Sequence, residues 1–127
     1  MANYVDSKII INKSVLKQLE KSAIRALEIT GDEVLGQIIE AQVVPMDVGT
    51  LQESGYVNTD ESNSGSVKIV FSTPYARRLY FHPEYNFRTD NNPNAKGKWM
   101  EDWTENGKYA DEVREIYAYH FKKLGGT

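Results

Sequence analysis

The chain has no cysteine and only two histidines among its 127 residues. Without cysteine there is no disulfide, no thiol nucleophile and no cysteine metal site, so packing alone must stabilise the fold. No run reaches the roughly 20 apolar residues that a bilayer crossing needs. The opening residues, MANYVDSKIII, lack the basic, apolar and small-residue regions of a secretory signal. We therefore expect a protein without a membrane partner that folds in a cytoplasm.

An excess of positive charge is also missing. The 15 Lys and Arg are outnumbered by 18 Asp and Glu, which gives a net charge of -3. A protein that grips duplex DNA needs several phosphate-neutralising cations on one face. The charge balance therefore argues against tight nonspecific binding of nucleic acid.

What is present is typical of a globular protein: 40% of the residues are hydrophobic and 26% are charged. A chain of this length suits one domain with one core, so we expect a single domain over residues 1–127. Its predicted segments are an N-terminal arm or strand over 1–12, a helical region over 13–44, a turn and β-hairpin over 45–72, short helices with a long loop over 73–108, and a C-terminal helix over 109–124.

The helical region is predicted from apolar residues that recur at helical spacing between Leu16 and Ile39. Asn12 suits the N-cap position. Gly31 lies inside the pattern, and because glycine weakens a helix interior we expect a kink or break there. Proline disfavours the α conformation in the residue before it, so the step from Val44 to Pro45 is the predicted end.

The pattern then changes to the period of a strand. Val67, Ile69 and Phe71 alternate with the residues between them, and Tyr56 to Thr59 is the predicted partner strand across the loop Asp60 to Gly65. Thr73 and Pro74 have the form of a helix N-cap and first helical position for a short helix over 75–80. Residues 84–98 are predicted to be a long loop with a brief strand around Asn86 to Arg88.

Two apolar groups complete the expected core. Trp99, Met100 and Trp103 share one face of a short helix, and a stripe at helical spacing marks the C-terminal helix, formed by Val113, Ile116, Tyr117, His120, Phe121 and Leu124. The predicted fold class is α+β, with a long N-terminal helix and a C-terminal helix packed on a small antiparallel β-sheet.

Residues for catalysis are few. His120 lies on the apolar helical stripe and is interpreted as a hydrogen-bonded packing residue. His82 with Glu84 has the form of a general base oriented by a carboxylate, although no nucleophile or oxyanion motif accompanies it. Asp60 and Glu61 lack the strand spacing to a lysine that a nuclease site needs. We therefore expect no catalytic residues, no metal and no cofactor.

Aromatic and cationic residues concentrate between Ser72 and Trp99. Tyrosine, tryptophan and arginine are the residues that protein interfaces concentrate at their centres. Arg77 and Arg78 are adjacent, so on a helix at most one of them can face the core. The candidate interface residues are Tyr75, Arg77, Arg78, Tyr80, Tyr85, Arg88, Asp47, Asp60 and Glu61.

The motif PMDVGTLQES together with STPYARRLYFHPEYNFRTDNNPNAKGKW, in this order around a hairpin, resembles the minor capsid proteins of tailed phages and prophages, which are similar to head-tail connector or neck proteins. The resemblance covers residues 40 to 103, and the chain departs after Trp103, where ENGKYADEV precedes the last helix. The matching positions are Pro45, Asp47, Gly49, Thr50, Leu51 and Ser54, then Pro74, Tyr75, Ala76, Leu79 and Tyr80, and later Asn92, Pro93, Ala95 and Trp99.

The resemblance implies a non-enzymatic virion component that is repeated as an oligomeric ring around the portal axis, in contact with portal, connector or tail proteins. DNA would pass nearby without specific binding, and the chain would be in the bacterial host cytoplasm during assembly and then at the capsid vertex. Pro45, Gly49, Thr50, Pro74, Pro93, Trp99 and Trp103 are the expected structural motif residues. A small hydrolase or nuclease using His82 and Glu84, and a host-surface binding module, are the alternatives.

Overall fold

The computed structural model describes residues 4–10, 21–45, 50–85, 87, 89 and 92–125. In chain order the elements are β1 (Val5–Ile10), α1 (Lys21–Glu40), α2 (Thr50–Glu53), β2 (Gly55–Asn58), the 3-10 turn η1 (Ser62–Ser64), β3 (Ser66–Phe71), α3 (Ala76–Tyr80), the 3-10 turn η2 (Glu101–Trp103) and α4 (Ala110–Lys123). This arrangement confirms the predicted α+β class, with its long N-terminal helix, C-terminal helix and small antiparallel sheet.

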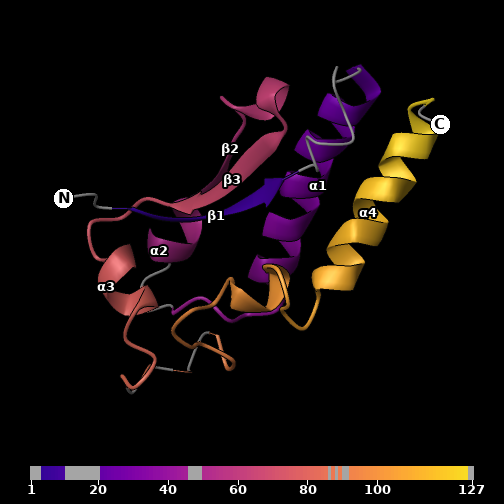
Figure 1. Cartoon of the computed structure of the whole chain (residues 1–127). Helices are drawn as coiled ribbons and strands as arrows, with labels where there is room; N and C mark the ends of the chain where they lie inside the picture. The colour runs from indigo at the N-terminus through magenta and orange to yellow at the C-terminus, as the bar shows by residue number, and fades with distance from the viewer. Residues whose placement is uncertain are drawn as a thin grey trace.

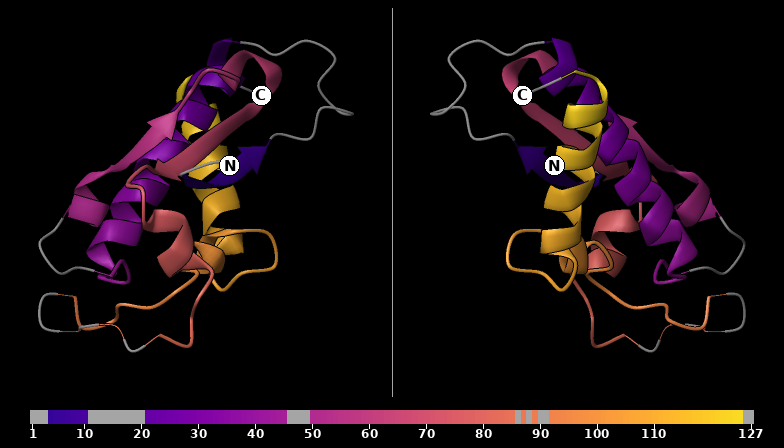
Figure 2. Two further views of the ribbon diagram at one scale, coloured as in Figure 1. Left: turned by 90° about the vertical axis from the view of Figure 1, so that its left-hand side faces the viewer. Right: turned by 90° about the vertical axis from the view of Figure 1, so that its right-hand side faces the viewer.

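The sheet has the strand order β1-β3-β2, and β3 pairs antiparallel with both neighbours. Val5 and Gly55 both lie opposite Phe71, one on each side. Of the two interpretations of the N-terminal segment, the structure has the strand. The strands form one layer, and α1 and α4 lie on the same side of it (Figure 1, Figure 2).

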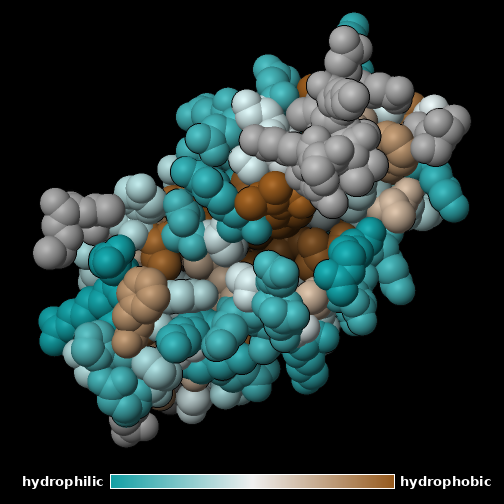
Figure 3. Space-filling model, viewed as in Figure 1, coloured by the Kyte–Doolittle hydropathy of each residue, from teal (hydrophilic) through white to brown (hydrophobic). Residues whose placement is uncertain are grey.

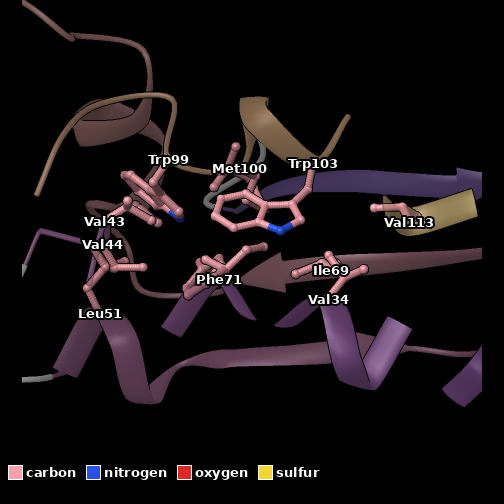
Figure 4. Packing of buried hydrophobic residues seen from close by; sticks show 13 residues of the cluster. Val34, Val43, Val44, Leu51, Ile69, Phe71, Trp99, Met100, Trp103 and Val113 are labelled. Carbon is pink, nitrogen blue, oxygen red and sulfur yellow. The ribbon is translucent and has the colours of Figure 1, made fainter. Parts of the chain in front are cut away.

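The core lies between this sheet and the helices. Ile69 and Phe71 from β3 point toward Trp99, Met100 and Trp103 (Figure 4). Trp99, Met100 and Trp103 follow the long loop, and all three are buried as predicted. Residues 101–103 form a 3-10 turn in place of the predicted short helix. α4 packs along α1, and its Val113 reaches the same cluster (Figure 1).

The expected kink at Gly31 is wrong, because α1 continues from Lys21 to Glu40 without a break. Gly31 is buried beneath the hairpin. A Cβ atom at this position would lie 2.9 Å from Cγ1 of Val57 and 3.1 Å from Cγ2 of Val67. The lack of a side chain at Gly31 therefore allows α1 to lie close to the sheet.

The predicted end of the helical region at Val44 is also wrong, since α1 ends at Glu40. Gln42 adopts a left-handed backbone with φ of 57°. The carbonyl oxygens of Gln42 and Val43 accept hydrogen bonds from the N–H groups of Asn94 and Lys96, at 3.2 and 2.9 Å. We therefore attribute the end of α1 to these hydrogen bonds with the long loop, and not to Pro45.

The predicted helix start at Thr73 and Pro74 is also wrong. α3 begins at Ala76 and Tyr75 occupies its N-cap position. The Thr73 hydroxyl is buried and has no hydrogen-bond partner among the described residues, so it does not cap the helix. Its backbone oxygen instead accepts from the Ala76 N–H at 3.1 Å, which forms a turn before the helix.

Several residues singled out in the sequence lie outside the described part of the chain: the predicted cap Asn12, the candidate residues Asp47 and Arg88, the motif residue Gly49, and Asn86 in the predicted brief strand. Thr50 begins α2. Of the other motif residues, Pro45, Trp99 and Trp103 are buried, whereas Pro74 and Pro93 are exposed.

Candidate interaction surface

Five of the residues between positions 75 and 85, four of them exposed and Tyr85 half-buried, form one surface on α3 and the turn that follows it. We call this surface the arginine corner, and it consists of Tyr75, Arg77, Arg78, Phe81 and Tyr85. Tyr75 and Phe81 are 42% and 50% exposed, which is high for aromatic residues. Both arginines are also exposed, so neither turns toward the core.

Each arginine of the corner lies over an aromatic ring. The guanidinium carbon of Arg77 is 5.3 Å from the centroid of the Phe81 ring, and that of Arg78 is 5.9 Å from the Tyr85 ring. Nε of Arg78 also donates to the Tyr85 hydroxyl at 3.5 Å. A cation over a ring face is attracted by the ring's quadrupole. The two charges are therefore held in place while they remain open to solvent.

His82 and Glu84 extend the same surface. Nδ1 of His82 lies 2.8 Å from Oε2 of Glu84, and the carboxylate must be the acceptor. This hydrogen bond lowers the pKa of Glu84 below its ordinary value. The imidazole stacks on the Tyr85 ring, with centroids 4.7 Å apart and planes 8° apart. The predicted pair thus exists, on an exposed turn and not in an enclosed cavity.

Tyr80 joins the corner to the core. Its ring meets Trp99 edge to face at 4.9 Å and Phe81 at 5.1 Å. Burial, with the nearby Glu101 carboxylate, raises the pKa of Tyr80 to about 12. Of the candidate interface residues on α3, Tyr80 is therefore the one that supports the surface from beneath.

The long loop is tied to the corner by backbone contacts. The backbone N–H of Lys98 donates a hydrogen bond of 2.8 Å to the backbone oxygen of Tyr80. A Cβ atom at Gly97 would lie 2.7 Å from the Cα of Pro83, so only glycine fits there without displacement. These contacts give α3 and the following turn a fixed base despite the lack of regular structure.

The two described acidic candidates, Asp60 and Glu61, lie on the hairpin loop beside η1. Oε2 of Glu61 is 3.9 Å from Nζ of Lys8 and accepts from the Ser66 hydroxyl at 3.3 Å. The hairpin loop and α3 are at opposite ends of the sheet (Figure 1). Among the described candidates, Asp60 and Glu61 therefore lie apart from Arg77 and Arg78 within one chain.

A groove between α1 and α4 was not predicted from the sequence. One hollow of about 480 Å³ and a second of about 290 Å³ share Gln37 and Glu112 in their linings. We call the pair the α1–α4 groove, and its carboxylates are Glu33, Glu40, Glu112 and Glu115. The spacing of these carboxylates is the signal that the sequence contains. Glu33 and Glu40 are seven residues apart on α1, and Glu112 and Glu115 are three residues apart on α4, so each pair lies on one face of its helix.

His120 crosses between the helices in this groove. Its Nε2 atom lies 2.6 Å from Oε1 of Glu33, which confirms its interpretation as a hydrogen-bonded packing residue. Lys108 and Lys123 lie near the two ends of α4, each 5.2 Å from a tyrosine ring. In the described part of the chain, no cation forms an ion pair with Glu112 or Glu115.

The face of the molecule shown in Figure 3 is largely hydrophilic, with hydrophobic residues gathered near its middle. Among the described residues, no group of three or more histidines and carboxylates is arranged to hold a metal ion. None of the described helices combines the length and the apolar character that spanning a membrane requires. Charge and aromatic rings are thus the main chemistry that the described surface offers.

Comparison of the chain with protein-family models, with curated proteins and with solved structures gives no match. The arginine corner, the α1–α4 groove and the resemblance in the sequence motifs are therefore the features that bear on function.

Proposed function

We propose that this chain is a structural virion protein of a tailed phage or prophage, a minor capsid or head-tail connector component that assembles at the portal vertex. The observation that carries the proposal is the arginine corner, where Arg77 and Arg78 are positioned over aromatic rings and open to solvent. Arginine and tyrosine in this arrangement suit a contact with another protein.

The packing of the two motifs behind the resemblance adds support. Leu51 from the first motif and Ala76 and Trp99 from the second belong to one core cluster. Nδ2 of Asn92 also donates to Oε1 of Gln52 at 2.8 Å. Two motifs that are distant in sequence thus form one unit, as expected if the pair is a family signature.

In this proposal the chain is not an enzyme and uses no cofactor. Its partners are further copies of itself in a ring, together with portal, connector or tail proteins. The net charge of -3 suits a component past which DNA moves without specific binding. The protein would be in the bacterial host cytoplasm until assembly and in the virion afterwards.

The test is made in the bacterium whose genome encodes the chain. Phage particles are induced and purified, and the chain is sought by mass spectrometry and by antibody labelling in electron microscopy. We expect the chain at one vertex of each particle, and we expect its deletion to separate heads from tails. Complete particles that lack the chain would overturn the proposal.

The contact between His82 and Glu84 favours a second candidate, a small hydrolase or nuclease. The hydrogen bond of 2.8 Å has the geometry of a base held by a carboxylate. His82→Ala and Glu84→Gln would abolish such an activity. Absence of turnover by the wild-type chain on nucleic-acid and ester substrates, with normal particle assembly in both variants, would dispose of this candidate.

A further inference from the structure

The arginine corner and the α1–α4 groove carry opposite charge on different parts of the molecule. In the described part of the chain, Arg77 and Arg78 contact aromatic rings and form no ion pair. Both arginines are exposed, and so are Glu112 and Glu115. α3 lies at the left and α4 at the right in Figure 1, and among the described residues neither Arg77 nor Arg78 forms an ion pair with Glu112 or Glu115 of its own chain.

We propose that the arginine corner of one copy binds the α1–α4 groove of a second copy, with Arg77 and Arg78 facing Glu112 and Glu115. The groove also has an apolar and aromatic part for the rings of the corner, because Ile116 and the 57% exposed Tyr119 line it. Opposite potentials on the two surfaces steer the encounter and fix its orientation.

The symmetry of this contact follows from its two different surfaces. A corner bound to a groove leaves a free groove on the first copy and a free corner on the second. Such a heterologous contact adds further copies in the same sense and gives a closed ring if the rotation between copies closes, or a filament if it does not. The inference rests on the proposed connector function, because it takes another copy of this chain as the partner.

The experiment exchanges charges between the two surfaces. Variant A carries Arg77→Glu and Arg78→Glu, and variant B carries Glu112→Lys and Glu115→Lys. Each variant alone presents like charges at the contact. In an equimolar mixture the reversed corner of A meets the reversed groove of B, and the native corner of B meets the native groove of A. Sedimentation and native mass spectrometry at low salt measure the association of each sample.

We expect each variant alone to associate roughly tenfold or more weakly than the wild-type chain. The mixture is expected to regain wild-type association, with the two variants alternating and therefore an even number of copies in any closed ring. A mixture that associates no better than its separate components would overturn the proposal. A wild-type chain that stays monomeric at every concentration would also overturn it.

A matched control carries Lys21→Glu and Lys122→Glu, which changes the net charge by the same amount as variant A. Lys21 is the first residue of α1 and Lys122 lies in the last turn of α4. Both lysines are exposed, and we expect wild-type association. Weakening equal to that of variant A would show a general charge effect and count against the contact. Failure of the charge exchange while the chain is still found in particles would remove this contact alone, whereas absence of the chain from particles would remove the connector function.

Discussion

The side-chain amide of Asn92 donates a hydrogen bond of 2.8 Å to the backbone oxygen of Val44. The same nitrogen lies 2.8 Å from Oε1 of Gln52 on α2, and Asn92 is 4% exposed. One buried side chain thus joins the segment after α1, α2 and the long loop that supports the arginine corner.

Asn92→Ala is expected to lower the free energy of unfolding by about 2 kcal/mol, because it leaves the buried Val44 carbonyl without its donor. Chemical denaturation followed by circular dichroism measures the change. Asn94→Ala is the matched control. It removes a hydrogen bond of 2.9 Å to the Ala41 oxygen at an exposed site and should cost less than about 1 kcal/mol. Equal losses would contradict the role given to Asn92.

The two glycines inside α1 are expected to respond in opposite directions to alanine. Among the described residues, nothing beyond the neighbouring backbone of α1 lies within 4 Å of a Cβ atom built at Gly36, so Gly36→Ala should stabilise the chain by about 0.5 to 1 kcal/mol through helix propensity. Gly31→Ala should destabilise it by about 1 to 3 kcal/mol, since the new methyl meets Val57 and Val67. Thermal unfolding of both variants distinguishes the effects, and stabilisation by Gly31→Ala would show that the hairpin does not pack as described.

Tyr80 is expected to make the protein sensitive to alkali. Its pKa is raised from the ordinary value of 10.0 to about 12, so folding favours the neutral phenol. The stabilisation is complete below pH 10 and is lost as the pH rises toward 12, by about 2 to 3 kcal/mol. Tyr80→Phe should remove this part of the alkaline loss while keeping the ring against Trp99. Urea unfolding from about pH 9 to about 12 measures it, with the 57% exposed Tyr119→Phe as control.

The pKa of Glu84 should depend on His82. In the fold this pKa lies below its ordinary value of 4.5 because of the hydrogen bond from the imidazole. The corresponding stabilisation is present above about pH 4.5 and is lost as the pH falls through the lowered pKa. His82→Ala should return the pKa toward its ordinary value, as followed by carboxyl NMR titration. His120→Ala should leave the Glu84 titration unchanged, and a shift in that variant would point to a different cause.

The regular elements could be predicted where their pattern depends on near neighbours. The alternation in β3 and the stripe on α4 both arise from the period of the element itself. The need for glycine at position 31 could not be predicted in this way, because the residues that require it come from β2 and β3. The end of α1 is similar, since its cause is the hydrogen bonding of Gln42 and Val43 to the long loop.

The candidate surface was predictable to the same degree. The aromatic and cationic composition of residues 75 to 85 predicts a contact surface there, although Phe81, which is 50% exposed, was not among the candidate interface residues. The α1–α4 groove was missed because its carboxylates come together only when two helices pair, as His120 and Glu33 do across 87 positions of sequence. Neither helix alone shows that its acidic residues face those of the other.

The central position of β3 also affects how the chain must behave while it is being made. β1 leaves the ribosome first, but its partner residues, such as Phe71 opposite Val5, are synthesised only after more than half of the chain. At usual rates of translation the delay is on the order of several seconds. The hairpin of β2 and β3 closes locally, so the nascent chain completes its sheet only when the waiting N-terminal strand joins the exposed edge of β3.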